Sequence, residues 1–198
     1  MTPRLRPPGS LARIAATLAL SIIAAACGDL TRPKPQSSNF TDTLSVFAIN
    51  GTASDAATGL WLFGNQAVQL DVAFNFDLAY DIDAQGNITL YTVRYVAGGL
   101  ASVHTVALQR VSTTFENLTE APQKGYVADT LFTVSPGDVF AVVSNDPSAC
   151  SFSLYSNQIY AKLQVLDVDL ARRSVRSRFT VNPNCGFLSL IPSGIPSK

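Results

Sequence analysis

The sequence predicts an all-β fold, an antiparallel β-sandwich or barrel of about ten strands. Large apolar residues alternate with polar ones over residues 68–83, the period-two pattern of a strand with one buried face. Turn sequences such as Pro136-Gly137-Asp138 and Asn145-Asp146-Pro147 separate further short apolar segments, as in sandwiches and barrels. With 198 residues, 47% hydrophobic and 14% charged, the chain has the composition of a globular protein.

The alternating segment is expected to form the first half of a hairpin. Residues 68–82 predict one long strand, or two strands with a bend, with apolar side chains on one face and carboxylates on a solvated face. Residues 83–87 supply turn residues, and the β-branched and aromatic run 88–96 predicts the returning strand. The carboxylates expected to face solvent are Asp77, Asp81 and Asp83.

Short runs of β-branched and aromatic residues predict the remaining strands. They are 44–49, 60–63, 102–115, 126–134, 139–144, 152–155, 159–168 and 175–181. Only residues 54–57 and 115–121 suggest helix, and both segments are short.

The first 26 residues have the composition of an export signal. They carry three arginines and no acidic residue, and an apolar run occupies residues 14–26. A helix of that length spans roughly 20 Å, less than the roughly 30 Å of a membrane hydrocarbon core. We therefore expect residues 1–26 to be a cleaved signal peptide and not a membrane span.

Small residues stand directly before a cysteine in the sequence Ala24-Ala25-Ala26-Cys27. This sequence resembles the lipobox of bacterial lipoproteins, although Ala24 stands where Leu is usual. The resemblance implies that Cys27 becomes the acylated first residue of the mature chain, which anchors the protein to a membrane. Because Gly28 follows Cys27, the resemblance favours the outer membrane. The alternative is an ordinary secreted protein in which Cys27 is incidental.

The segment after the signal peptide is expected to separate the anchor from the body. Residues 27–39 contain Pro33 and Pro35 and show no apolar periodicity, so we interpret them as the lipidated cysteine and a flexible tether. Residues 40–198 are expected to form a single all-β domain.

Cys150 and Cys185 are the other two cysteines. An exported protein occupies an oxidising compartment, so we expect these two to form a disulfide. Neither has a second cysteine or a histidine nearby, which argues against a metal site.

Charge and composition argue against nucleic acid as a partner and against a metal or a cofactor. After residue 26 the chain carries 11 basic and 14 acidic residues, a net charge of 11 − 14 = −3, which argues against nucleic acid as a partner. With one histidine and few other reactive side chains, we expect no metal and no cofactor. The sequence Asp81-Ile82-Asp83-Ala84-Gln85-Gly86 partly follows a calcium-loop pattern, but Thr92 occupies the twelfth place, and a β-turn explains it more simply.

Catalysis has few candidate residues. His104 with a serine and an aspartate could form a hydrolytic triad, yet there is no Gly-x-Ser-x-Gly sequence. Glu116 and Glu120 lie four residues apart, as a carboxylate pair on one helical turn would. A core or edge histidine and a solvated loop are the simpler interpretations, so we assign no catalytic residue and expect a protein that is not an enzyme.

Four side chains are candidates for contact with a ligand. Tyr91 and Tyr95 lie on the strand parity opposite to the core and could stack against a ligand. Arg176 and Arg178 share one face of a strand, where they could bind phosphate, an anionic headgroup or the acidic residues near Asp77. The simpler alternative for the arginines is pairing within the protein or with solvent.

Residues 76–82 and 160–165 are similar in style to haem-scavenging outer-membrane lipoproteins of the HmuY type. That resemblance implies a shared β fold. Those proteins hold haem with a pair of histidines, whereas this chain has His104 alone.

These observations predict an outer-membrane-anchored envelope lipoprotein with a non-enzymatic β-domain. Its expected partner is an envelope protein, a glycan or a small ligand, besides the membrane reached through Cys27. Two alternatives remain open: a hydrolase that uses His104 or a Glu116/Glu120 site, and a purely structural coat or assembly subunit.

Overall fold

The computed structural model describes residues 34–71, 73–100, 103–145, 150, 151, 153, 156–192, 194 and 195. The chain divides into two units, Met1–Lys34 and Pro35–Lys198. The expected signal peptide and Cys27 lie outside the described residues. No helix in the described part of the chain is long and apolar enough to cross a membrane.

Among the described residues, the second unit contains eleven strands and one short helix. The strands are β1 (Phe40–Phe47), β2 (Gly59–Trp61), β3 (Gln66–Val68), β4 (Leu78–Ile82), β5 (Ile88–Thr92), β6 (Thr105–Val111), β7 (Val127–Ala128), β8 (Leu131–Val134), β9 (Val139–Asn145), β10 (Ile159–Asp169) and β11 (Ser174–Asn182). The helix is α2 (Val93–Val96).

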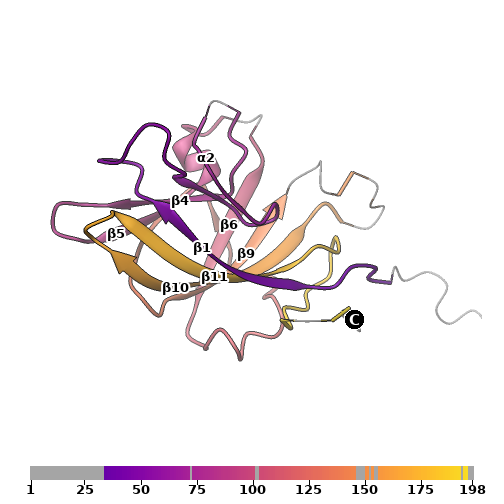
Figure 1. Ribbon diagram of the computed structural model, residues 1–198. Coiled ribbons are helices and arrows are strands. Elements are labelled where there is room, and N and C mark those ends of the chain that lie inside the picture. The colour runs from indigo at the N-terminus through magenta and orange to yellow at the C-terminus, as the bar shows by residue number, and fades with distance from the viewer. Residues whose placement is uncertain are drawn as a thin grey trace, which may run out of the picture. The chain divides into compact units, whose positions relative to one another are not determined.

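The strands form two open antiparallel sheets, which confirms the all-β prediction and identifies the fold as a sandwich (Figure 1). Sheet A has the order β1-β11-β10-β9-β6-β7, and sheet B has the order β3-β2-β4-β5-β8. Neither sheet closes on itself, so the barrel alternative is excluded.

The two sheets share one apolar core. Sheet B contributes Leu78 and Tyr80, and sheet A contributes Leu163 and Phe179, all of which are fully buried. The Tyr80 hydroxyl lies 2.8 Å from the Ser177 hydroxyl, so a buried hydrogen bond also crosses between the sheets. This pairing satisfies two polar groups that burial would otherwise penalise.

Sheet A is also buried on its outer face. A second cluster there combines Ala141 and Val143 of β9 with Phe115, Leu118 and Leu190 from the segments that cross the sheet. Every residue of β9 except the last is buried, because the strand has protein on both sides.

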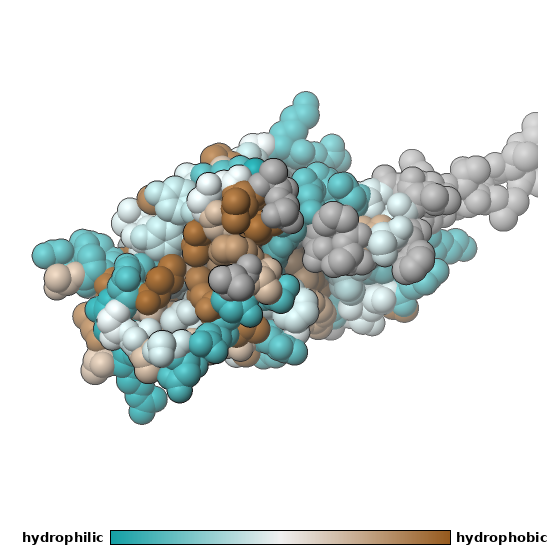
Figure 2. Space-filling model, turned by 90° about the horizontal axis from the view of Figure 1, so that it is seen from above, coloured by the Kyte–Doolittle hydropathy of each residue, from teal (hydrophilic) through white to brown (hydrophobic). Residues whose placement is uncertain are grey.

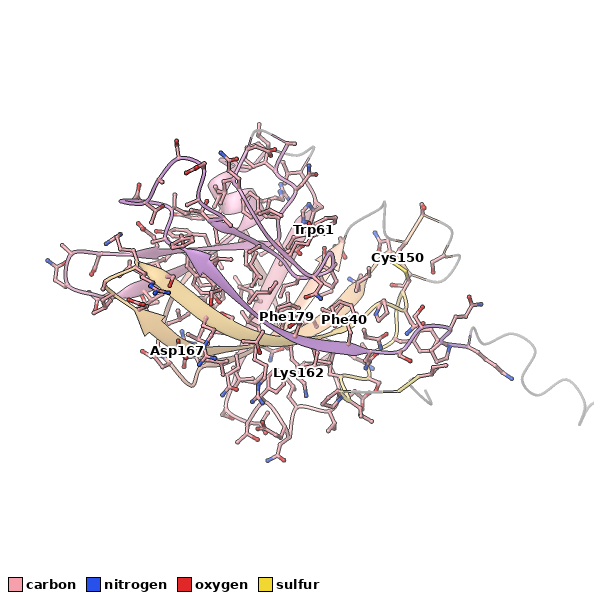
Figure 3. The ribbon with its side chains drawn as sticks, viewed as in Figure 1. Phe40, Trp61, Cys150, Lys162, Asp167 and Phe179 are labelled. Atoms are coloured by element: carbon pink, nitrogen blue, oxygen red, sulfur yellow. A yellow bond between two sulfur atoms is a disulfide. The ribbon has the colours of Figure 1, made fainter. Side chains whose placement is uncertain are left out.

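Lys162 lies inside this outer cluster with none of its surface exposed, on the side of the sheet opposite to Phe179 (Figure 3). Its ammonium group donates hydrogen bonds to the carbonyl oxygens of Phe115 at 2.7 Å and Leu118 at 2.9 Å. The ammonium nitrogen also lies 4.5 Å from the centre of the Phe115 ring, a cation–π distance. Burial lowers the pKa of Lys162 from its ordinary value to about 8, and Glu116 partly opposes this effect.

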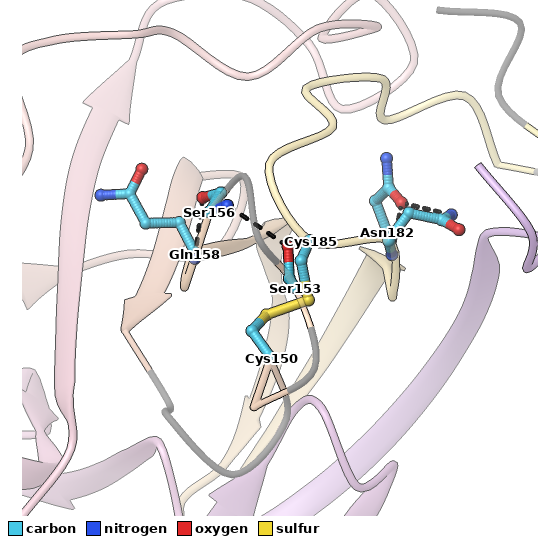
Figure 4. Close-up of a disulfide and its surroundings, with 7 residues drawn as sticks. Cys150, Ser153, Ser156, Gln158, Asn182 and Cys185 are labelled. Carbon is cyan, nitrogen blue, oxygen red and sulfur yellow. Dashed lines mark hydrogen bonds between the residues drawn. A yellow bond between two sulfur atoms is a disulfide. The ribbon is translucent and has the colours of Figure 1, made fainter. Parts of the chain in front are cut away.

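Cys150 and Cys185 form the expected disulfide (Figure 4). The bridge fixes the start of the C-terminal segment beside Gln158, whose carbonyl oxygen accepts a hydrogen bond from the Gly186 N–H. A disulfide that closes a loop of this length stabilises a fold by about 4 kcal/mol in the chain-entropy account.

The C-terminal segment in turn holds the chain that enters β1. The Asn184 side chain accepts hydrogen bonds from the N–H groups of Gln36 and Ser37 and donates to the Ser37 carbonyl. The Asn39 amide donates to the carbonyl oxygens of Ser189 and Ile191. The last residues of the expected tether, 36–39, are therefore bonded to the body, and the rest of it up to residue 33 lies outside the described residues.

The prediction of one long strand, or two strands with a bend, over 68–82 is wrong for residues 69–77. Only Val68, in β3, and residues 78–82, in β4, lie in strands. Between them the Asp71 side chain accepts a hydrogen bond from the Ala73 N–H, and the Phe74 N–H donates to the Asp71 carbonyl. Phe74 has φ of +51°, so the chain turns there and leaves the sheet.

Two other expected strands end early. The strand expected over 88–96 stops at Thr92, and α2 continues the chain as a helical turn. The strand expected over 126–134 splits into β7 and β8, which belong to different sheets, because Asp129 has φ of +52° and turns the chain.

The remaining boundaries differ less. The strand expected over 102–115 is shortened to β6, and the helices suggested at 54–57 and 115–121 are turns and irregular chain. The strand expected over 152–155 falls mainly outside the described residues.

The buried Lys162 predicts a stability difference that depends on pH. Between about pH 8 and 10.5 the unfolded chain keeps the lysine proton that the folded protein has lost, so the folded state gains stability as the pH rises. In urea titrations, the unfolding free energy of the wild type relative to Lys162→Met should rise across this range. A constant difference between pH 7 and 10.5 would contradict a depressed pKa. Lys124→Met, on a residue outside the cluster, is the control.

Candidate functional site

The only histidine of the chain is hydrogen-bonded to a buried carboxylate. His104 lies immediately before β6, and Asp77 lies immediately before β4. The His104 Nε2 atom is 3.0 Å from the Asp77 Oδ1 atom. The backbone of Asp77 is fixed on both sides, because its N–H donates to the Leu60 carbonyl and its own carbonyl accepts from the Val93 N–H. The second carboxylate oxygen accepts a longer hydrogen bond, 3.4 Å, from the Phe63 N–H.

The electrostatics of this pair follow from its burial. Asp77 is 1% exposed, and loss of water raises the pKa of its carboxyl group. The hydrogen bond and the charge of His104 oppose this rise in pKa. The N–H groups of Phe63 and Leu62 oppose it to a smaller extent. The His104 side chain is 16% exposed, so the carboxylate orients an imidazole that solvent reaches. A buried carboxylate that orients a histidine is one half of a general-base arrangement.

The pair lies at the end of the sandwich that carries α2. Phe63, Val96 and Val103 are partly buried around this end, and Leu100 in the turn after α2 is 51% exposed. Figure 2 looks down on the side where α2 lies and shows apolar residues gathered near the middle of that face, with polar residues around them.

The solvated carboxylate face predicted for residues 68–82 is wrong at Asp77, because the chain leaves the strand pattern before that residue. The prediction is confirmed for Asp83, which is exposed, and Asp81 is partly buried; both also bond within the protein. Asp81 pairs with Arg173 and accepts from the Asn50 amide, and Asp83 accepts from Asn87 in the β4–β5 turn.

The hydrogen bonds of Asp83 match the β-turn interpretation of residues 81–86. Within the described ranges, no group of three or more His, Cys, Asp or Glu side chains could hold a metal ion.

Tyr91 and Tyr95 come together although α2 replaces the end of the expected strand. Tyr91 is in β5 and Tyr95 is in α2, and their ring centres lie 5.6 Å apart with an angle of 33° between the planes. Tyr95 is 44% exposed, so the ring pair is accessible to a partner.

Arg176 and Arg178 are each engaged by an acidic side chain. Arg176 donates to Asp167, and this ion pair lowers the pKa of Asp167. Arg178 donates to Glu116 and Gln164, both at 2.7 Å. The guanidinium of Arg178 also lies over the Phe115 ring at 4.1 Å. Both side chains therefore follow the simpler alternative, pairing within the protein.

Glu116 and Glu120 do not share a helical turn. Residues 115–117 form a turn, whereas Glu120 pairs through its backbone with Ser189 in an isolated bridge. The backbone N–H of Glu116 and then Arg178 lower the pKa of the Glu116 carboxyl group. A charged Glu116 paired with arginine does not suit the protonated acid that glycoside hydrolysis needs.

Removal of the His104 imidazole should raise the pKa of Asp77 and lower the free energy of unfolding. His104→Ala should raise the pKa of Asp77 further, because the two largest effects that lower it are lost. The variant should also lose about 3 kcal/mol of unfolding free energy at pH 7, as an unpaired buried charge does. Carboxyl NMR titration and urea unfolding measure the two effects.

Asp77→Asn in the His104→Ala background is the matched control. Because it removes the unpaired charge, it should recover part of the lost stability. An unchanged Asp77 pKa in His104→Ala would contradict the described hydrogen bond.

Comparison with known proteins identifies no relative. No protein-family model matches the chain, and no match was found among curated proteins or solved structures.

Proposed function

We propose that this protein is a lipid-anchored lipoprotein of the bacterial envelope, delivered to the outer membrane, whose β-sandwich binds another envelope component. The observation that carries the proposal is the Cys150–Cys185 disulfide. Disulfides persist in oxidising compartments outside the cytosol, in agreement with the export signal expected at residues 1–26. The bridge uses two of the three cysteines and leaves Cys27, the one that follows three alanines, for acylation.

The body supports a binding role through its surface. Tyr91 and Tyr95 form an accessible aromatic pair, and tyrosine is enriched where proteins meet their partners. The Cys150–Cys185 bridge and the buried cover of sheet A make a rigid support for such a surface. An envelope protein, a glycan and a small ligand are the partner classes that fit.

The anchor is tested by Cys27→Ser. This variant should move from the membrane fraction to the soluble fraction and should lose incorporation of labelled palmitate, because the acylated thioether cannot form. Thr31→Ala, in the same segment with Cys27 intact, should stay in the membrane fraction. If Cys27→Ser remained with the membranes, the anchor would be placed elsewhere and the proposal would fail.

A hydrolase is the second candidate, and the Asp77–His104 hydrogen bond is the observation that favours it. The bond supplies an oriented base, the requirement that the Glu116/Glu120 alternative lacks. The purified chain would be assayed with short-chain nitrophenyl esters across pH 6–9.

A turnover that His104→Gln removes while the fold survives would support the hydrolase. A turnover that His104→Gln leaves unchanged, or none at all with esters, would reject His104 as an esterase base.

A further inference from the structure

Two tyrosines and a leucine line one region of the outer surface of sheet B. Tyr91 is paired across the strands with Ala79 and Leu131, so the three side chains point to the same face. Leu90 next to Tyr91 is fully buried in the core, so Tyr91 and Leu131 point away from it. Ala79 is fully buried as well, so the exposed part of this face lies on β5 and β8. Leu131 is 41% exposed, and Tyr95 adds its ring from α2.

A polar row runs beside these residues on the same face. Thr89 lies two residues before Tyr91, about 7 Å along the strand, and therefore shares its side. It is paired with Thr133 on β8 and with Asp81 on β4. The face thus presents an aromatic row next to the hydroxyl groups of Thr89 and Thr133, while the Asp81 carboxylate is engaged by Asn50 and Arg173.

The charged side chain on this face and that of the adjacent α2 are both paired within the protein. Arg94 in α2 lies 3.4 Å from Asp129, and Asp81 pairs with Arg173 at 3.7 Å. A surface with paired charges gives no net attraction to a nucleic acid or to anionic lipid headgroups. Charge therefore favours an uncharged ligand.

The size of the apolar area favours a small ligand. Stable protein interfaces bury about 800 Å² on each partner through about 20–30 residues. Within β5, β8 and α2, the exposed large apolar side chains are those of Tyr95 and Leu131, beside the partly exposed Tyr91. That area suits one or two sugar rings better than a protein partner.

The chemistry of sugars fits the two rows. A pyranose ring presents an apolar face of C–H groups and a rim of hydroxyl groups. The C–H face stacks on an aromatic ring, while threonine hydroxyls can exchange hydrogen bonds with the rim. Sugars whose hydroxyl groups are equatorial expose the flattest C–H faces.

We propose that the face formed by Thr89, Tyr91, Tyr95, Leu131 and Thr133 binds an uncharged glycan, with a sugar ring stacked on Tyr95 and Tyr91. This inference rests on the proposed envelope-binding function and names the class of its ligand. The site differs from the Asp77–His104 pair, which the hydrolase alternative would use.

Isothermal calorimetry with the acylated mature protein in detergent tests the proposal. The probes are β-1,4-linked tetramers of N-acetylglucosamine and of glucose, both rich in equatorial substituents. The wild type should bind at least one of them saturably, and Tyr95→Ala should weaken that binding by about tenfold or more. Tyr95→Phe should stay within about twofold, because it keeps the ring face. Phe47→Ala, which removes an exposed aromatic ring from β1, should bind like the wild type.

Two results would overturn the glycan assignment. One is no saturable binding of either tetramer by the wild type, and the other is unchanged binding in a Tyr95→Ala variant that melts at the wild-type temperature. A photo-crosslinking residue at position 95 in living cells separates this failure from that of the proposed function. Crosslinks to a protein alone would reject the glycan and keep the envelope-binding role, whereas crosslinks to glycan material would support the inference.

Discussion

Strand β9 is buried on both faces. One face of sheet A packs against sheet B, and the other is covered by the 112–126 segment and the C-terminal segment, which we call the cover. Two interactions hold this cover against the sheet. Lys162 binds the carbonyl oxygens of the first segment, and the Cys150–Cys185 disulfide fixes the second. Because the C-terminal segment also binds residues 36–39, the entry of the chain into β1 depends on the same cover.

Local sequence chemistry predicted the fold class but not its boundaries. Period-two patterns and turn residues account for the two sheets and for hairpins such as β4–β5. The errors arise where side chains redirect the backbone. Asp71 ends a pattern that alternates perfectly in the sequence, and positive φ at Asp129 divides one apolar run between two sheets. An alternating pattern predicts which residues can share one face of a strand, but it does not predict whether a neighbouring strand is present for hydrogen bonding.

The candidate sites differ in how much of them the sequence could reveal. Parity predicted Tyr91 and Tyr95 on one strand face, and their rings lie together although Tyr95 reaches its neighbour from a helical turn. The burial of Asp77 was missed, because its partner lies 27 residues away and only the tertiary fold brings them together. The environment of Lys162 could have been predicted in part, because a single charged residue in an apolar strand requires hydrogen-bond partners where that strand is covered.

We propose that an oxidised, disulfide-closed body is tied to the envelope through Cys27. The intact mass of the protein extracted from membranes, measured with and without reductant, tests this proposal. We expect a chain that begins at an acylated Cys27 and gains the mass of two hydrogens on reduction, at Cys150 and Cys185. An unacylated chain, or one whose mass does not change with reductant, would contradict it.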